Sequence, residues 1–137
     1  MIMKILSTIL LTLLIVFGAC TSPQVSPDPF VRVSNGRLTV NGKPYYYIGT
    51  NFWYGAILGS QGQGGNRERL LRELDYLKAL GINNLRVLVG ADGKDGIPTK
   101  AEPALQVEAG VYNDTIFDGL DFFLSELDKR DMYAVLS

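Results

Sequence analysis

The chain has 137 residues, one cysteine, no histidine and a formal net charge of −1, which allows one domain and gives no long-range attraction to nucleic acid or acidic lipid. Because histidine is absent, the chain lacks the Ser-His-Asp and Cys-His arrangements and the common metal signatures. We therefore expect no metal and no other cofactor.

Residues 1–19 predict an export signal. Lys4 precedes the uncharged run Ile5–Ala19, which is shorter than the roughly 20 residues that span a bilayer. The end of this run resembles the lipobox of bacterial lipoproteins, in which Cys20 would be lipidated after cleavage, although Phe17 stands where Leu, Val or Ile is preferred. Cleavage without lipidation and an uncleaved apolar anchor are the alternatives. We expect an extracytoplasmic protein, either secreted or a cell-surface or periplasmic lipoprotein, that touches the membrane only through Cys20.

Residues 20–29 are rich in proline and serine and predict a short extended tether, so the folded part begins near Phe30. Short alternating runs follow, separated by Asn35-Gly36 and Asn41-Gly42. Asn-Gly is the strongest short-range hairpin signal, and we expect two successive tight turns.

The stretch Tyr45–Ile48 predicts a buried strand that leads into an aromatic loop, Asn51 to Tyr54. Open α/β folds and barrels bind ligands where strands end at this edge. The aromatic faces of Trp53 and Tyr54 match the C–H faces of sugar rings, and the amide of Asn51 matches their hydroxyl groups. We expect these three residues to bind substrate and Phe52 to fill the core; the alternative for Trp53 is that it also fills the core.

The glycine-rich segment Gly59–Gly65 predicts no regular structure, and it lacks the spacing of a phosphate-binding loop. Asn66 is the expected N-cap of a helix that runs through Leu80 and ends before Gly81. Its leucines at positions 70, 74, 77 and 80 have helical spacing.

Asn84–Val89 is a short apolar run of the kind found in parallel strands covered on both faces. Arg86 lies within it, and a buried arginine is costly unless a carboxylate pairs with it. In a barrel, its parity would direct it inward and direct Leu85 and Val87 toward the helices. The alternative is an edge-strand arginine that reaches solvent.

A long loop, 90–112, carries Asp92, Asp95, Glu102 and Glu108. A pair of these acids for sugar hydrolysis and ordinary acids of a surface loop are both possible interpretations. A helix capped by Asn113 or Asp114 then runs from about residue 115 to 130, and a third strand follows at 132–136. The expected inner face of the helix at 115–130 is formed by Phe117, Leu120, Leu124 and Leu127.

The alternation of strands and helices predicts an α/β fold with parallel strands and right-handed crossovers. Ser137 directly follows an apolar run, so we expect residues 30–137 to be an incomplete piece of a larger domain. A complete small three-strand protein is the alternative.

Several short motifs together resemble the opening of a glycoside hydrolase family 5 barrel, and a later segment is similar to the β-mannanases of that family. The motifs are Phe30–Val33, Leu38–Pro44, Gly49–Trp53, Leu77–Asn83 and Leu85–Val87, and the later segment is Gly110–Asn113 with Phe117–Phe122. The resemblance implies a (β/α)₈ TIM barrel preceded by a small β-hairpin. It also implies retaining hydrolysis of internal β-1,4 bonds in mannan-type polysaccharides.

By the same resemblance, Arg86 supports the catalytic nucleophile, and Trp53 lines the substrate cleft. The acid/base and nucleophile glutamates of the family follow the fourth and seventh strands, whereas this chain reaches only the third, so we expect the piece to be inactive alone. A non-catalytic glycan-binding surface lipoprotein and a family 5 cellulase are the alternatives.

Overall fold

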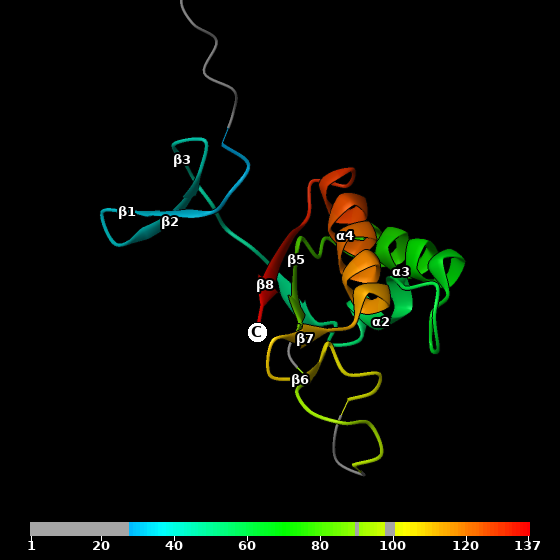
Figure 1. Ribbon diagram of the computed structural model, residues 1–137. Coiled ribbons are helices and arrows are strands. Elements are labelled where there is room, and N and C mark those ends of the chain that lie inside the picture. Colours follow the sequence, from blue (N-terminus) through cyan, green and yellow to red (C-terminus); the bar gives the residue numbers. More distant parts are fainter. Residues whose placement is uncertain (1–27, 90, 98–100) are drawn as a thin grey trace, which may run out of the picture. The chain divides into compact units, whose positions relative to one another are not determined.

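The computed structural model describes residues 28–89, 91–97 and 101–137 (Figure 1). The chain divides into two compact units, Met1–Tyr45 and Tyr46–Ser137. The expected signal segment, the lipidation site Cys20 and most of the expected tether lie outside the described residues.

The first unit contains an antiparallel sheet of three short strands in the order β1 (Arg32–Ser34), β2 (Arg37–Val40) and β3 (Lys43–Pro44). Both connecting turns have positive φ at two successive residues, 50° and 71° in the first turn and 50° and 73° in the second. That geometry defines the type I′ turn, which Asn-Gly adopts easily because neither residue pays a large steric cost there. The two predicted hairpins are confirmed.

The second unit is built on a parallel sheet in the order β4-β5-β8, formed by β4 (Gly49–Asn51), β5 (Asn84–Val87) and β8 (Tyr133–Leu136). Helices α3 (Arg67–Ala79) and α4 (Asp114–Asp128) connect the strands and lie, with the short α2 (Gly55–Gly59), on one side of the sheet (Figure 1). The predicted α/β class and the parallel strands are confirmed.

The expected buried strand Tyr45–Ile48 is wrong, because the strand begins only at Gly49. Tyr46 and Ile48 are 78% and 64% exposed. The backbone of this segment is hydrogen-bonded to Asn83, so it is extended without belonging to the sheet ladder. An apolar segment is buried only where helices or another sheet cover it. Among the described residues, the helices cover the sheet from β4 onward and not the segment before it.

Both helices begin at the predicted caps. The side chain of Asn66 accepts a hydrogen bond from the backbone nitrogen of Arg69 (2.9 Å), and that of Asn113 accepts one from Thr115 (3.2 Å). Gly81 has φ +83°, as expected for the residue that ends α3.

The core lies between the helices and the sheet, and two expected core positions are wrong. Leu80 is 57% exposed and Phe117 is 37% exposed. In α4, Leu120 and Leu127 are buried as predicted, whereas Ile116 and Phe123 are buried in place of Phe117 and Leu124.

Sequence reasoning missed three elements. Helix α2 (Gly55–Gly59) lies in the expected aromatic and glycine-rich loop. The ribbon of β6 (Gln106–Glu108) and β7 (Val111–Tyr112) lies in the expected long loop. Gly59 and Gly119 bring α2 and α4 together, since a Cβ on either residue would overlap backbone atoms of the other helix or of the residue after it. Glycine here serves close packing, which composition alone does not distinguish from irregular structure.

Candidate functional site

The polar residues of the candidate site lie at the carboxyl ends of β4 and β5. The parallel register places Asn51 beside Arg86. The Nη1 of Arg86 lies 3.5 Å from the Oδ1 of Asn51, and both side chains are exposed. The backbone nitrogen of Phe52 donates to the carbonyl oxygen of Arg86 at 2.8 Å, which continues the pairing one residue beyond β4.

Arg86 points to this open face because its neighbours occupy the other one. Leu85 and Val87 are fully buried against the helices, as predicted, so alternation along the strand turns Arg86 away from them. The expectation of a buried arginine is wrong for the described residues, and so is the edge-strand alternative, since β5 is the central strand. Among the described residues, the only side chain that forms a hydrogen bond with the side chain of Arg86 is that of Asn51.

Trp53 and Phe52 take opposite positions directly after β4. Phe52 is buried and its ring stacks on Phe123 with centroids 5.8 Å apart, which confirms it as a core residue. Trp53 is 45% exposed and meets the ring of Tyr54 edge-on at 5.4 Å. The alternative in which Trp53 fills the core is therefore not what the structure shows. Its indole borders an apolar pocket that reaches the loop at Leu105.

The hydroxyl group of Tyr54 points to α3. It donates a hydrogen bond to the Oε2 of Glu73 at 2.8 Å. Burial raises the pKa of Tyr54, and this hydrogen bond raises it further. The edge of β4 and this side of α3 border a second pocket, whose lining includes Asn51, Tyr54, Glu73 and Tyr76. The structure thus brings Asn51 next to Arg86, whereas the hydroxyl of Tyr54 is engaged elsewhere.

The acids of the long loop hold the loop itself together. The Oδ1 of Asp95 accepts from the backbone nitrogen of Ala104 at 2.9 Å, and Glu102 accepts from that of Gly96. Glu108 lies 3.8 Å from the Nζ of Lys94. These contacts favour the interpretation of ordinary loop acids over a catalytic pair.

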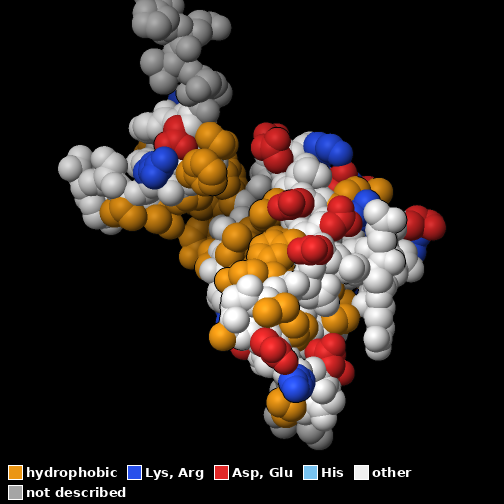
Figure 2. All heavy atoms as spheres, viewed as in Figure 1, with side chains coloured by type: hydrophobic (Ala, Val, Ile, Leu, Met, Phe, Trp, Pro, Cys, Tyr) orange, Lys and Arg blue, Asp and Glu red, His pale blue; other side chains and the backbone are white. Residues whose placement is uncertain are grey.

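In residues 28–89, 91–97 and 101–137, no group of three or more His, Cys, Asp or Glu side chains is placed to hold a metal ion. None of the helices in these same ranges has the length and apolar character needed to cross a membrane. On the face shown in Figure 2, acidic, basic and apolar side chains are interspersed over the region of the helices.

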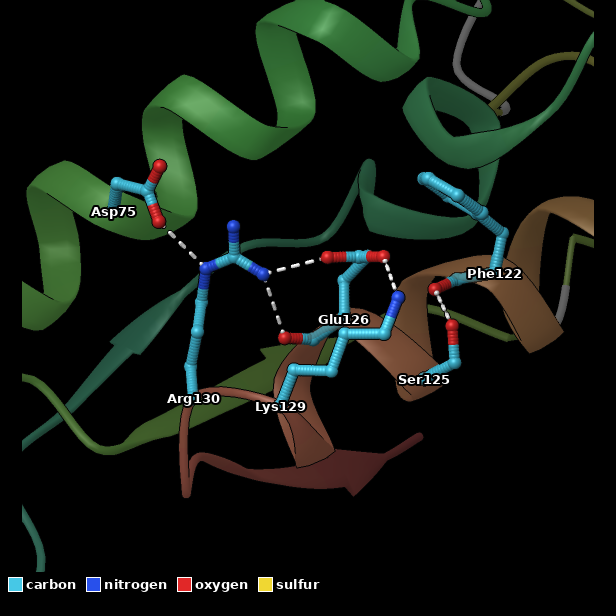
Figure 3. A network of polar contacts seen from close by, with 6 residues as sticks. All are labelled: Asp75, Phe122, Ser125, Glu126, Lys129 and Arg130. Atoms are coloured by element: carbon cyan, nitrogen blue, oxygen red, sulfur yellow. Dashed lines mark hydrogen bonds and ion pairs between the residues drawn. The ribbon is translucent and has the colours of Figure 1, made fainter.

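A network of charges around the buried Glu126 joins α4 to α3 away from the site (Figure 3). Glu126 binds the Nζ of Lys129 at 2.5 Å and the Nη1 of Arg130 at 2.7 Å, and Arg130 also binds Asp75 of α3 at 2.8 Å. The hydrogen bonds from Lys129 and then Arg130 lower the pKa of Glu126. Each of the four charged side chains has a partner of opposite charge within the cluster. The cluster therefore stabilises the pair of helices and is not a candidate for chemistry.

One residue that bears on the site was missed by sequence reasoning. Asn83 lies just before β5 and binds the backbone of Tyr46 and Ile48, the segment that leads into β4. The sequence shows only two successive asparagines before an apolar run, which gives no indication of such a role.

Three kinds of comparison agree on what the chain is similar to. The profile of a family described as glycoside hydrolase family 5 beta-mannosidase-like matches residues 28–137. Mannan endo-1,4-beta-mannosidase 1 of Oryza sativa subsp. japonica is 34% identical over 79% of this chain and 23% of its own length. Mannan endo-1,4-beta-mannosidase 5 of Solanum lycopersicum is 31% identical over 79% of this chain and 24% of its own. The chain thus spans about a quarter of the length of these relatives.

Among solved structures, a glycoside hydrolase family 5 mannosidase from Rhizomucor miehei matches with a TM-score of 0.74 and 36% identity, over 80% of this chain and 27% of that one. An endo-1,4-beta-mannanase from the same fungus matches with a TM-score of 0.57 and 21% identity, over 78% and 29%. The second match supports the fold alone.

Proposed function

The chain belongs to the glycoside hydrolase family 5 beta-mannosidase-like family, and from this premise we propose that the whole protein is a retaining endo-β-1,4-mannanase. Its substrate class is mannan-type polysaccharide. We further propose that residues 30–137 form part of a (β/α)₈ catalytic domain. The three parallel strands with their connecting helices support this proposal.

The observation that carries the proposal is the pairing of Asn51 with Arg86 on the open face of the sheet, with Trp53 one residue past Phe52. An exposed indole offers a flat apolar face to a sugar ring. The amide and the guanidinium offer acceptor and donor groups to hydroxyl oxygens or to a carboxylate. In this proposal Asn51, Trp53 and Tyr54 contact the sugar, and Tyr54 contributes its ring because its hydroxyl binds Glu73.

The reaction itself needs two carboxyl groups about 5–5.5 Å apart, one as nucleophile and one as acid/base. In the family these glutamates follow later strands than the three described here. We assign to Arg86 the role of holding the nucleophilic carboxylate in its ionised form, since a nearby guanidinium favours the charged state. Residues 30–137 alone are expected to bind poorly and to release no sugar.

Product analysis on the full-length protein tests the proposal. Incubated with galactomannan and with β-1,4-mannohexaose, the protein should release a range of short oligosaccharides and lower the viscosity of the polymer early. Carboxymethylcellulose serves as the matched glucan. Binding to mannan without release of reducing ends would favour a non-catalytic glycan-binding protein, and faster hydrolysis of the glucan would favour a family 5 cellulase.

The higher similarity to a solved mannosidase favours a second candidate, an exo-acting enzyme that removes single mannose units. The same product analysis separates the two modes. An exo-acting enzyme releases mannose as the first product and leaves the viscosity of galactomannan almost unchanged. Mannose as the sole early product would therefore replace the endo assignment.

We also propose that residues 1–19 are a lipoprotein-type signal, that Cys20 is lipidated and that residues 20–29 are a tether. The protein would then be extracytoplasmic, at the cell surface or in the periplasm. Metabolic labelling with an alkyne fatty acid should mark the wild-type protein and not the Cys20→Ser variant. Equal absence of label from both would leave cleavage without lipidation or an uncleaved anchor.

A further inference from the structure

Asn83 binds the segment that enters β4 through both groups of its side-chain amide. The Oδ1 accepts a hydrogen bond from the backbone nitrogen of Ile48 at 2.9 Å, and the Nδ2 donates to the carbonyl oxygen of Tyr46 at 3.1 Å. A side chain that contributes both a donor and an acceptor to one extended segment imitates a neighbouring strand.

The backbone of Asn83 extends this connection to the third strand. Its nitrogen donates to the carbonyl oxygen of Ile48 at 3.0 Å. Its carbonyl oxygen accepts from the backbone nitrogen of Tyr133, the first residue of β8, also at 3.0 Å. One residue therefore joins the amino-terminal ends of all three parallel strands.

This connection bears on the candidate site because β4 is only three residues long and starts with glycine. Register is weakly specified in a strand that buries no face, and in β4 Gly49 and Asn51 are exposed and Thr50 is half-buried. A slip of one residue turns every side chain to the opposite face. Such a slip would direct Asn51 away from Arg86. In the observed register, Asn83 bonds Tyr46 and Ile48 at the same time.

We propose that Asn83 is a positioning residue for the glycan site: it fixes the register of β4 and thereby places Asn51 and Trp53 relative to Arg86. This inference rests on the proposed function, because that function assigns the glycan to these residues. Asn83 itself lies at the opposite end of the strands from the site and touches no substrate.

The first test measures register at the far end of β4 by amide hydrogen exchange. In the full-length protein, the Asn83→Ala variant should speed exchange at the Phe52 nitrogen, which bonds Arg86, by about tenfold, the value of one typical hydrogen bond. The matched control is Asn66→Ala, which also removes an amide that accepts one backbone hydrogen bond, but at the N-cap of α3. The control removes an N-cap and should therefore speed exchange at the first amides of α3 more than at Phe52. Faster exchange at Ile48 with an unchanged rate at Phe52 would overturn the proposal.

The second test uses kcat/KM on mannohexaose, with the folded fraction measured by circular dichroism. Displacing a binding group by about 1 Å can cost on the order of 100-fold, so Asn83→Ala should lose at least about tenfold in kcat/KM. Asn83→Asp keeps the oxygen that accepts from Ile48 and should recover part of this loss. Equal losses in the Asn83→Ala and Asn66→Ala variants would overturn the proposal. A wild-type protein without binding or hydrolysis would refute the proposed function, and the exchange comparison would still decide the role of Asn83.

Discussion

Neighbouring residues of β5 have opposite tasks, and the alternation of a strand explains why. Leu85 and Val87 are fully buried, whereas Arg86 between them is exposed beside Asn51. A guanidinium carries five N–H donors in a fixed fork, and one contact at 3.5 Å to Asn51 leaves most of them for a carboxylate or a sugar hydroxyl. Binding chemistry and core packing are thus separated within two residues.

Paired substitutions in β5 should separate activity from stability. The Leu85→Ala variant removes a fully buried side chain and should lower the free energy of unfolding by about 2–5 kcal/mol. The Arg86→Ala variant changes a side chain that is exposed in the described residues and should lower it by less than Leu85→Ala does. Its kcat/KM on mannohexaose should nevertheless fall by about 100-fold or more, as for loss of a group that stabilises charge. Urea denaturation and initial rates measure the two effects, and full activity of Arg86→Ala would refute its assigned role.

At the scale of elements, local chemistry predicted the helix starts and the hairpins better than it predicted what lies between them. Asn66, Asn113 and the two Asn-Gly turns act through their own backbone neighbours, so their roles can be predicted from a short window of sequence. Helix α2 was missed because its glycines are selected by contact with α4, which is distant in the sequence.

The close contact between α2 and α4 predicts that replacing a glycine there by alanine destabilises the protein. Alanine is normally about 1 kcal/mol more favourable than glycine inside a helix. At Gly119, however, an added Cβ would lie 2.6 Å from the backbone nitrogen of Ser60, and rigid backbone cannot move aside as a side chain can. The Gly119→Ala variant should therefore lose about 1–3 kcal/mol by overpacking. The Ser125→Ala variant, at an exposed position of the same helix, is the control and should stay within about 0.5 kcal/mol in urea denaturation.

At the scale of the whole molecule, the order of strands and helices was enough to predict parallel strands and the edge where a site would lie. It did not predict the length of β4 or the exposure of the tyrosines before it, because these depend on which faces other layers cover. The pairing of Asn51 with Arg86 also depends on register, which the hydrogen bonds of Asn83 favour and which no local pattern encodes. The edge of the sheet that carries Asn51 and Arg86 could thus be predicted from the sequence, but the contact between them could not.

The charge network between α3 and α4 makes the fold sensitive to acid in a direction that follows from the pKa of Glu126. Bonds from Lys129 and then Arg130 lower this pKa below its ordinary value of 4.5. A lowered folded-state pKa contributes stability above the unfolded value, and this contribution is lost as the pH falls through the folded value. The Glu126→Gln variant should therefore be less stable than wild type by about 1.5–3 kcal/mol at pH 7. This difference should shrink as the pH falls below about 4.5.

Urea denaturation of both proteins across this pH range measures the difference. The matched control is Glu68→Gln, which changes a carboxylate that is 85% exposed and pairs with Arg72 one turn along α3. Exposed pairs of this kind contribute about 0.3–0.5 kcal/mol, so the control should follow wild type closely at every pH. A stability difference for Glu126→Gln that stays constant from pH 7 to pH 3 would show that the side chain acts through packing and not through its charge. The ionised carboxylate of Glu126 would then not be what links α4 to Arg130.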